Sequence, residues 1–211
     1  MRARLLHLVA VSFLALTASA GCAPAEESKD NGGSAAVNDG VDNEIRTASD
    51  AAIMGKLKGI LKDVTFTSES DYGYVVFEGE AVPAGTKRLT TALLRQKLAA
   101  GVKANSDDHR DIAPTKCRAV RLNVSSTIAD GDAAVVPTDP NADDFVYAKH
   151  DKQLGIALKT MRASLKNVVG YTFGTNESGD QDELGTVVYV YVGVSKTTGK
   201  LIAIMTQAVY T

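Results

Sequence analysis

The chain has 211 residues, with 23 basic and 25 acidic side chains, a formal net charge of −2 and no tryptophan. Contacts with phosphate groups require a cationic surface, and no dense run of Lys or Arg is present. Composition therefore argues against direct nucleic acid binding.

The first residues have the pattern of an export signal. A basic start is followed by an apolar stretch at residues 5–16, which is too short to span a bilayer. Ala18-Ser19-Ala20 fits a cleavage site that would release a soluble protein. Alternatively, residues 19–22 resemble a bacterial lipobox ending at Cys22, although Ser19 stands where Leu is usual.

We favour the lipoprotein, with residues 1–22 as its signal peptide, because a cysteine at this place is otherwise hard to explain. The expected location is then the outer membrane or periplasm, with a lipid on Cys22 as the membrane anchor, and secretion is the alternative. Cys117, the only other cysteine, would be a lone thiol. Cleavage after Ala20 would instead allow a Cys22–Cys117 disulfide.

Residues 23–46 predict a disordered tether. They contain six acids, two bases and almost no large apolar side chain, so they cannot bury enough surface to offset the entropy of ordering. The remaining residues, 47–211, are sufficient for one folded domain.

Hydrophobic periodicity predicts the elements of that domain in chain order. Thr47 or Ser49 caps the first helix, and Gly101 ends the second. Residues 128–144, small and polar with two prolines, predict a loop. We expect helices at residues 47–62, 86–100 and 143–167, and strands at residues 73–80, 117–125, 168–175, 185–195 and 201–210.

The last three strands follow one another directly, and a hairpin at residues 197–199 joins two of them. Such a meander requires antiparallel pairing, and its sheet needs helices on its faces. The order of elements therefore predicts an α+β sandwich on an antiparallel-rich sheet.

No constellation in the sequence predicts catalysis. His109 lies in a polar loop, and His150 is expected to be exposed on the longest helix. Neither a nucleophile elbow nor a phosphate-binding glycine loop is found. We therefore expect no enzyme activity and no cofactor; a hydrolase has the weakest support.

Two short stretches suggest a binding function instead. Ser68-Glu69-Ser70 places a carboxylate in the turn between a helix and a strand. The last predicted strand continues to Thr211 with no polar tail, whereas chain ends are usually disordered unless they are held or used. A plain capped turn with a solvated Glu69 is the alternative.

Several segments resemble the nuclease A inhibitor family, small proteins that block sugar-non-specific nucleases. The resemblance covers residues 54–211 and is weakest between residues 82 and 151. It implies a three-layer α-β-α sandwich that occludes the metal-containing active site of a secreted or periplasmic nuclease. The segments are FTSESDY (66–72), VFEGEA (76–81), SLKN (164–167), VYVYVG (188–193) and VYT (209–211).

The resemblance also implies roles for individual residues. Glu69, between Ser68 and Ser70, would engage the cationic pocket that otherwise holds a phosphate, and Thr211 would reach the catalytic metal of the nuclease.

The family makes a further contact through a Trp-containing stretch ahead of the long helix. The nearest analogue here is Asp143-Asp144-Phe145, without a tryptophan. The alternative function is an exported lipoprotein binding module of the same fold with a different partner.

Overall fold

The computed structural model describes residues 48–68, 71–105, 119–174 and 185–210. None of the helices in these ranges is both long and apolar enough to cross a membrane. The helices are α2 (Asp50–Ile60), α3 (Thr91–Asn105), α4 (Val124–Ala133) and α5 (Phe145–Ser164), and the strands are β1 (Thr65–Phe66), β2 (Tyr72–Gly73), β3 (Val75–Ala81), β4 (Ala119–Leu122), β5 (Leu165–Gly174), β6 (Gly185–Ser195) and β7 (Lys200–Tyr210).

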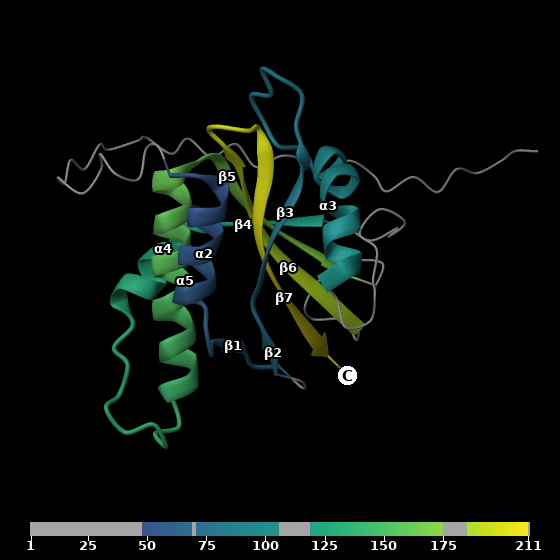
Figure 1. Ribbon diagram of the computed structural model, residues 1–211. Coiled ribbons are helices and arrows are strands. Elements are labelled where there is room, and N and C mark those ends of the chain that lie inside the picture. The colour runs from purple at the N-terminus through teal and green to yellow at the C-terminus, as the bar shows by residue number, and fades with distance from the viewer. Residues whose placement is uncertain (1–47, 69–70, 106–118, 175–184, 211) are drawn as a thin grey trace, which may run out of the picture.

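A five-stranded antiparallel sheet forms the centre of the domain, with strand order β3-β7-β6-β5-β4 (Figure 1). β6 and β7 are joined by a tight turn in which Gly199 has a φ of 71°. The predicted meander and the α+β class are confirmed. β1 and β2 pair separately as a small hairpin, Thr65 with Gly73 and Phe66 with Tyr72.

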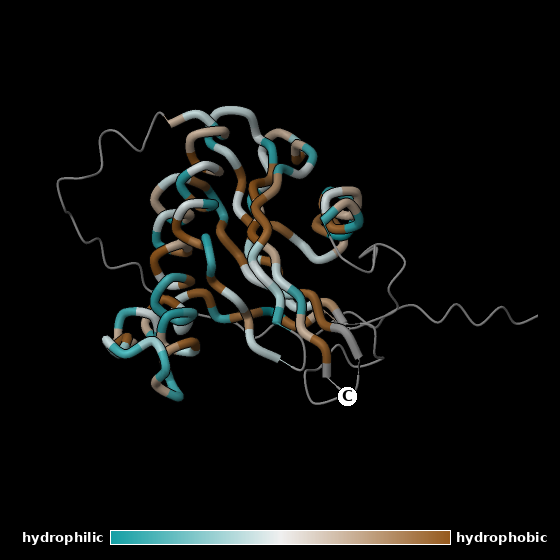
Figure 2. Tube along the Cα trace, turned by 60° about the horizontal axis from the view of Figure 1, so that its bottom comes forward, coloured by the Kyte–Doolittle hydropathy of each residue, from teal (hydrophilic) through white to brown (hydrophobic). Residues whose placement is uncertain are grey.

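Helices lie on both faces of the sheet. Helix α3 packs on one face through Leu94, Leu98 and Val102. Helices α2 and α5 pack on the other through Leu57 and Leu158, among others. Hydrophobic residues gather along the central strands and on the sides of the helices that face them (Figure 2). Both faces of β7 are therefore buried, which explains its nearly continuous apolar sequence.

The predicted second helix was wrong at both ends. Helix α3 begins five residues later than expected and continues through Gly101 to Asn105. A Cβ at Gly101 would lie 2.3 Å from the ring of Phe77, a buried residue of β3. The glycine permits close packing of helix on sheet and does not end the helix.

The loop predicted at residues 128–144 was wrong in its first part, where α4 extends to Ala133. Asn123 caps this helix, since its side chain accepts hydrogen bonds from the backbone N–H groups of Ser125 and Ser126. The helix has little apolar periodicity because it packs closely on α5, with Gly131 against Gly155. A contact between small residues leaves no apolar stripe in the sequence.

Two neighbouring boundaries also differ. The strand predicted at residues 117–125 is limited, within the described residues, to Ala119–Leu122, in which Val120 is exposed. Helix α5 ends at Ser164 rather than at residue 167, and Leu165 begins β5. Leu165 continues the helical spacing, but tertiary pairing with Ser195 decides its conformation.

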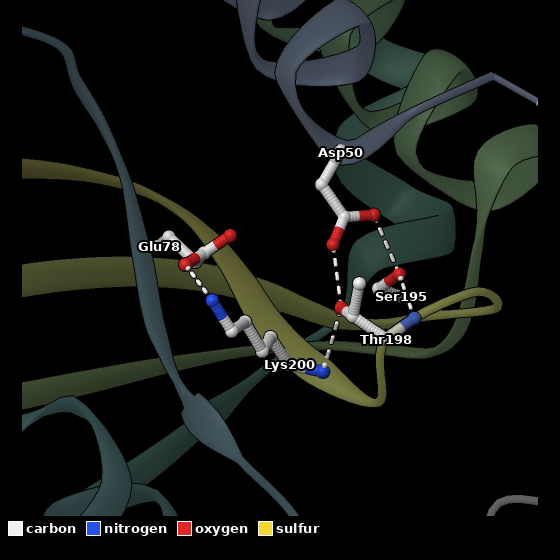
Figure 3. A network of polar contacts seen from close by, with 5 residues as sticks. All are labelled: Asp50, Glu78, Ser195, Thr198 and Lys200. Carbon is white, nitrogen blue, oxygen red and sulfur yellow. Dashed lines mark hydrogen bonds and ion pairs between the residues drawn. The ribbon is translucent and has the colours of Figure 1, made fainter.

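A polar network around the buried Asp50 and Ser195 joins α2 to the turn between β6 and β7 (Figure 3). Asp50 accepts hydrogen bonds from the hydroxyls of Ser195 and Thr198, each at 2.5 Å. Ser195 Oγ also accepts from the backbone N–H groups of Thr197 and Thr198. The network fixes the first turn of α2 against the end of the sheet. Of the two caps expected for this helix, Ser49 makes the capping hydrogen bond.

The same substitution, Gly to Ala, should have opposite effects at the contact between α4 and α5 and at an open position on α2. A Cβ at Gly131 would lie 2.5 Å from the backbone oxygen of Asp151, whereas a Cβ at Gly55 of α2 would meet nothing within 4 Å. We expect Gly131→Ala to lower the free energy of unfolding by about 1–3 kcal/mol. Gly55→Ala should raise it by roughly 0.5–1 kcal/mol. Urea denaturation measures both, and equal effects of the two variants would contradict the close helix crossing.

Candidate partner-binding site

The hairpin of β1 and β2 is attached to the final strand of the sheet. The backbone N–H of Val209 donates a hydrogen bond to Ser68 Oγ at 3.2 Å. Three residues earlier in the same strand, the hydroxyl of Thr206 lies 3.3 and 3.2 Å from the carbonyl oxygens of Tyr72 and Gly73, to which it can donate. The hairpin and the end of β7 consequently lie at the same end of the molecule (Figure 1).

These contacts bear on the residues predicted from the sequence. Glu69, Ser70 and Thr211, like Cys22, lie outside the described residues, so their positions stay predictions. Their described neighbours meet, because Ser68 directly precedes Glu69 and Val209 lies two residues before Thr211. Ser68 itself is half-buried.

The other three predicted residues lie at the start of α5, at the same end of the domain (Figure 1). Asp143 and Asp144 are exposed. Asp144 occupies the N-cap position of α5, yet its side chain makes no capping hydrogen bond. The Asp144 carboxylate is therefore not used to satisfy the helix end.

Phe145 is half-buried and lines a pocket of about 80 Å³ between the start of α5 and the connection from α2 to β1. The ammonium group of Lys149 donates a hydrogen bond to the backbone oxygen of Asp63 at 2.9 Å and so joins the two sides. Asp63 has a φ of 56°, a left-handed conformation that Asp and Asn tolerate better than most residues. The pocket is lined by Asp63, Val64, Thr65, Phe145, Val146, Lys149 and His150.

His150, expected to be exposed, is one of the best-connected side chains of this region. Its side chain is only 14% exposed. Nε2 lies 2.7 Å from the hydroxyl of Tyr74, and Nδ1 lies 2.9 Å from Oδ1 of Asp151. A carboxylate only accepts, so Nδ1 carries a proton, and in the neutral ring Nε2 accepts from Tyr74.

Ring contacts continue this connection toward the hairpin. The centroid of Phe66 in β1 is 5.4 Å from that of His150 and 4.9 Å from that of Tyr189 in β6. His150 thus contacts Phe66, which precedes Ser68 in the chain, and Tyr74, which follows it. The sequence contains no local pattern for this arrangement, because Tyr74 and His150 are 76 residues apart.

Burial, the largest effect, together with Tyr191 and Asp151, raises the pKa of Tyr74 well above its usual value of 10.0. Tyr74 therefore keeps its proton and can donate to His150 over the whole neutral range.

Within the described residues, no three His, Cys, Asp or Glu side chains gather as a metal site. The fold thus places two exposed acidic residues, a pocket and an anchored hairpin at one end of the domain.

No protein-family model matches this chain, and no curated protein matches it in sequence.

The hydrogen bond between Tyr74 and His150 should stabilise the fold at neutral pH and less so at alkaline pH. Because the pKa of Tyr74 is raised, the native state binds more protons than the unfolded state once the pH rises above 10, and the free energy of unfolding falls there. At neutral pH, Tyr74→Phe should lower the free energy of unfolding by about 1 kcal/mol. The difference between wild type and variant should shrink as pH rises past 10. Urea denaturation at pH values on either side of 10 measures it, and a constant difference would contradict the role of the Tyr74 proton.

Proposed function

We propose that this protein inhibits a secreted or periplasmic sugar-non-specific nuclease by occluding its metal-containing active site. The observation that carries the proposal is the hydrogen bond from Val209 to Ser68, which joins the neighbours of Glu69 and Thr211. Glu69 follows Ser68 directly, and Thr211 is two residues after Val209, so both proposed contact residues are next to anchored positions in the chain.

The chemistry of the target suits these residue types. Nucleases of this kind stabilise a phosphoryl transition state with a hydrated metal and basic side chains. In the proposal, the Glu69 carboxylate takes the place of phosphate charge in the basic pocket. Thr211 supplies oxygen ligands, which hard divalent cations prefer.

Rigidity and charge support the same function. The hydrogen bonds of Ser68 and Thr206 attach the hairpin to β7, so less order has to be gained when a partner binds. The exposed Asp143 and Asp144 add negative charge at the same end of the domain. A nuclease surface that binds nucleic acid is cationic, and opposite charges accelerate association.

Two substitutions test the contact residues in the full chain. We expect wild-type protein to inhibit a purified sugar-non-specific nuclease, and Glu69→Gln to weaken inhibition about 30-fold or more, because a charged partner in the basic pocket is lost. Deletion of Thr211 should have a comparable effect. The matched control is Asp71→Asn, which removes an exposed carboxylate two residues away and should change inhibition little.

The outcomes separate the site from the function. If a variant that combines Glu69→Gln with loss of Thr211 inhibits as well as wild type, the assignment of the site is wrong. If wild-type protein inhibits no nuclease of this class, the function itself is wrong. Envelope pull-downs that recover another protein would then favour the alternative, an exported binding module.

The location is a separate part of the proposal and depends on residues 1–22 alone. We expect Cys22 to carry a lipid that anchors the protein in the bacterial envelope. Cells that express the full chain should incorporate labelled palmitate into it, and Cys22→Ser should abolish the label. Release of unlabelled wild-type protein into the medium would instead show cleavage without lipidation.

A further inference from the structure

We propose that the basic end of the domain, formed by Lys87, Arg88, Lys166 and Lys196, docks on the anionic headgroups of a phospholipid membrane. This end lies opposite the β1–β2 hairpin. The inference rests on the proposed lipid anchor at Cys22 and deepens it, because it assigns the surface with which the anchored domain faces the membrane.

The chain enters the domain at this end. Residues 23–46 precede α2, and Asp50 in the first turn of that helix is bonded to the turn between β6 and β7. The hairpin is attached at the other end of β7, through Val209. A lipid on Cys22 would therefore hold the start of α2 near the membrane and leave the hairpin at the far end of the domain (Figure 1).

The exposed basic side chains of this end come from three separate segments. Lys87 and Arg88 lie in the connection from β3 to α3. Lys166 is the second residue of β5, and Lys196 directly follows β6. All four are exposed. Within the part of the chain that the structure describes, the ammonium groups of Lys87 and Lys166 make no hydrogen bond or ion pair, so they are available to an anionic surface.

Hydrogen bonds bring the three segments side by side. Asn167, which follows Lys166, donates from its side-chain amide to the backbone oxygen of Thr86 at 3.4 Å. The ammonium group of Lys196 donates to the backbone oxygen of Ala163 at 2.7 Å. A carbonyl partner leaves the positive charge of Lys196 uncompensated. The basic side chains therefore form one surface.

The described acids near this surface are already bonded within the domain. Glu78 pairs with Lys200 at 2.6 Å, and Glu80 pairs with Lys97 at 2.8 Å. The buried carboxylate of Asp50 accepts two hydroxyl groups (Figure 3). These acids therefore do little to offset the charge of the basic end.

The connection from β3 to α3 has the shape of a membrane contact. It projects beyond the neighbouring helices (Figure 1). Its tip, Pro-Ala-Gly at residues 83–85, is uncharged and exposed. The tip is held as a turn, because the backbone N–H and the hydroxyl of Thr86 both donate to the oxygen of Pro83. An uncharged tip followed by Lys87 suits the boundary between headgroups and hydrocarbon.

Charge at the opposite end favours the same orientation. Asp71 follows the masked part of the hairpin turn, and Asp143 and Asp144 precede α5; all three are exposed. An anionic surface attracts the basic end and repels these carboxylates. The proposed nuclease contacts would therefore face away from the membrane and stay accessible.

The expected strength suits a domain that is already tethered. Each basic side chain near an anionic membrane increases affinity about fivefold, and the effect decays over about 8 Å at physiological salt. A few such residues attach a free protein only weakly. A lipid anchor keeps the local concentration of the domain high, so the same residues then orient it.

The test uses residues 23–211, which contain the whole described domain but lack the export signal and the proposed lipid. Sedimentation measures binding to vesicles of phosphatidylcholine alone or mixed with phosphatidylglycerol. We expect binding only to vesicles with phosphatidylglycerol, and its loss at high salt. A variant that combines Lys87→Gln with Lys166→Gln should bind about 25-fold more weakly. Any competition from the acids of residues 23–46 is included, because they are present in the tested chain.

The matched control combines Lys58→Gln with Lys62→Gln. Both lysines are exposed, and the change in net charge is the same. Lys58 is eight residues beyond Asp50, about 12 Å along α2, and Lys62 lies beyond the end of that helix. We expect vesicle binding within about twofold of wild type, because this distance exceeds the range of unscreened attraction. Urea denaturation of each variant shows whether the fold is kept.

Amide hydrogen exchange locates the contact. Vesicles with phosphatidylglycerol should slow exchange at residues 82–90 and 196–199. Exchange in the hairpin strands, residues 65–66 and 72–73, should not change.

The possible results are distinct. Absence of binding to anionic vesicles, or equal losses from the two double variants, overturns this surface. Binding of a short DNA duplex in preference to the vesicles would also overturn it and would assign the basic end to nucleic acid. Nuclease inhibition is measured without vesicles, and the lipid on Cys22 is measured by palmitate labelling. Failure of this surface is therefore distinguishable from failure of the proposed function or location.

Discussion

Strand β7 is the constraint on which the rest of the structure depends. It pairs with β3 along one edge and with β6 along the other. Leu201, Ala203 and Met205 belong to the core on one face, and Ile202 and Ile204 belong to the core on the other. A shift of one residue would exchange these two sets and break both ladders, so the register of β7 is strongly determined.

The two ends of the β6–β7 pair are used differently. At the turn, Asp50 receives the hydroxyls of Ser195 and Thr198 and joins the strands to α2. At the other end, β7 provides attachment points for the β1–β2 hairpin through Thr206 and Val209. Both ends bring together segments that are distant in sequence, but only the second carries the β1–β2 hairpin (Figure 1).

His150 connects the parts of that second end. It lies on α5, bonds to Tyr74 between β2 and β3, and contacts Phe66 in β1. His150, together with the hydrogen bond from Lys149 to Asp63, therefore positions the start of α5 relative to the hairpin. A partner that contacted both would meet a preformed surface, and preformed surfaces lose less entropy on binding.

Sequence by itself determined the elements whose signal is local. The run of β-branched and aromatic residues in β6 defined residues 185–195 correctly, Ser49 was one of the two caps expected for the first helix, and the succession of three final strands required an antiparallel sheet. Tertiary structure decided what no local pattern contains. Helix α4 depends on a contact between Gly131 and Gly155, and Gly101 is needed because Phe77 lies against it. Likewise, Ser68 meets Val209 across 141 residues, and Tyr74 meets His150 across 76. Periodicity shows which face of an element is apolar, but the partner on that face is set only when the whole chain packs.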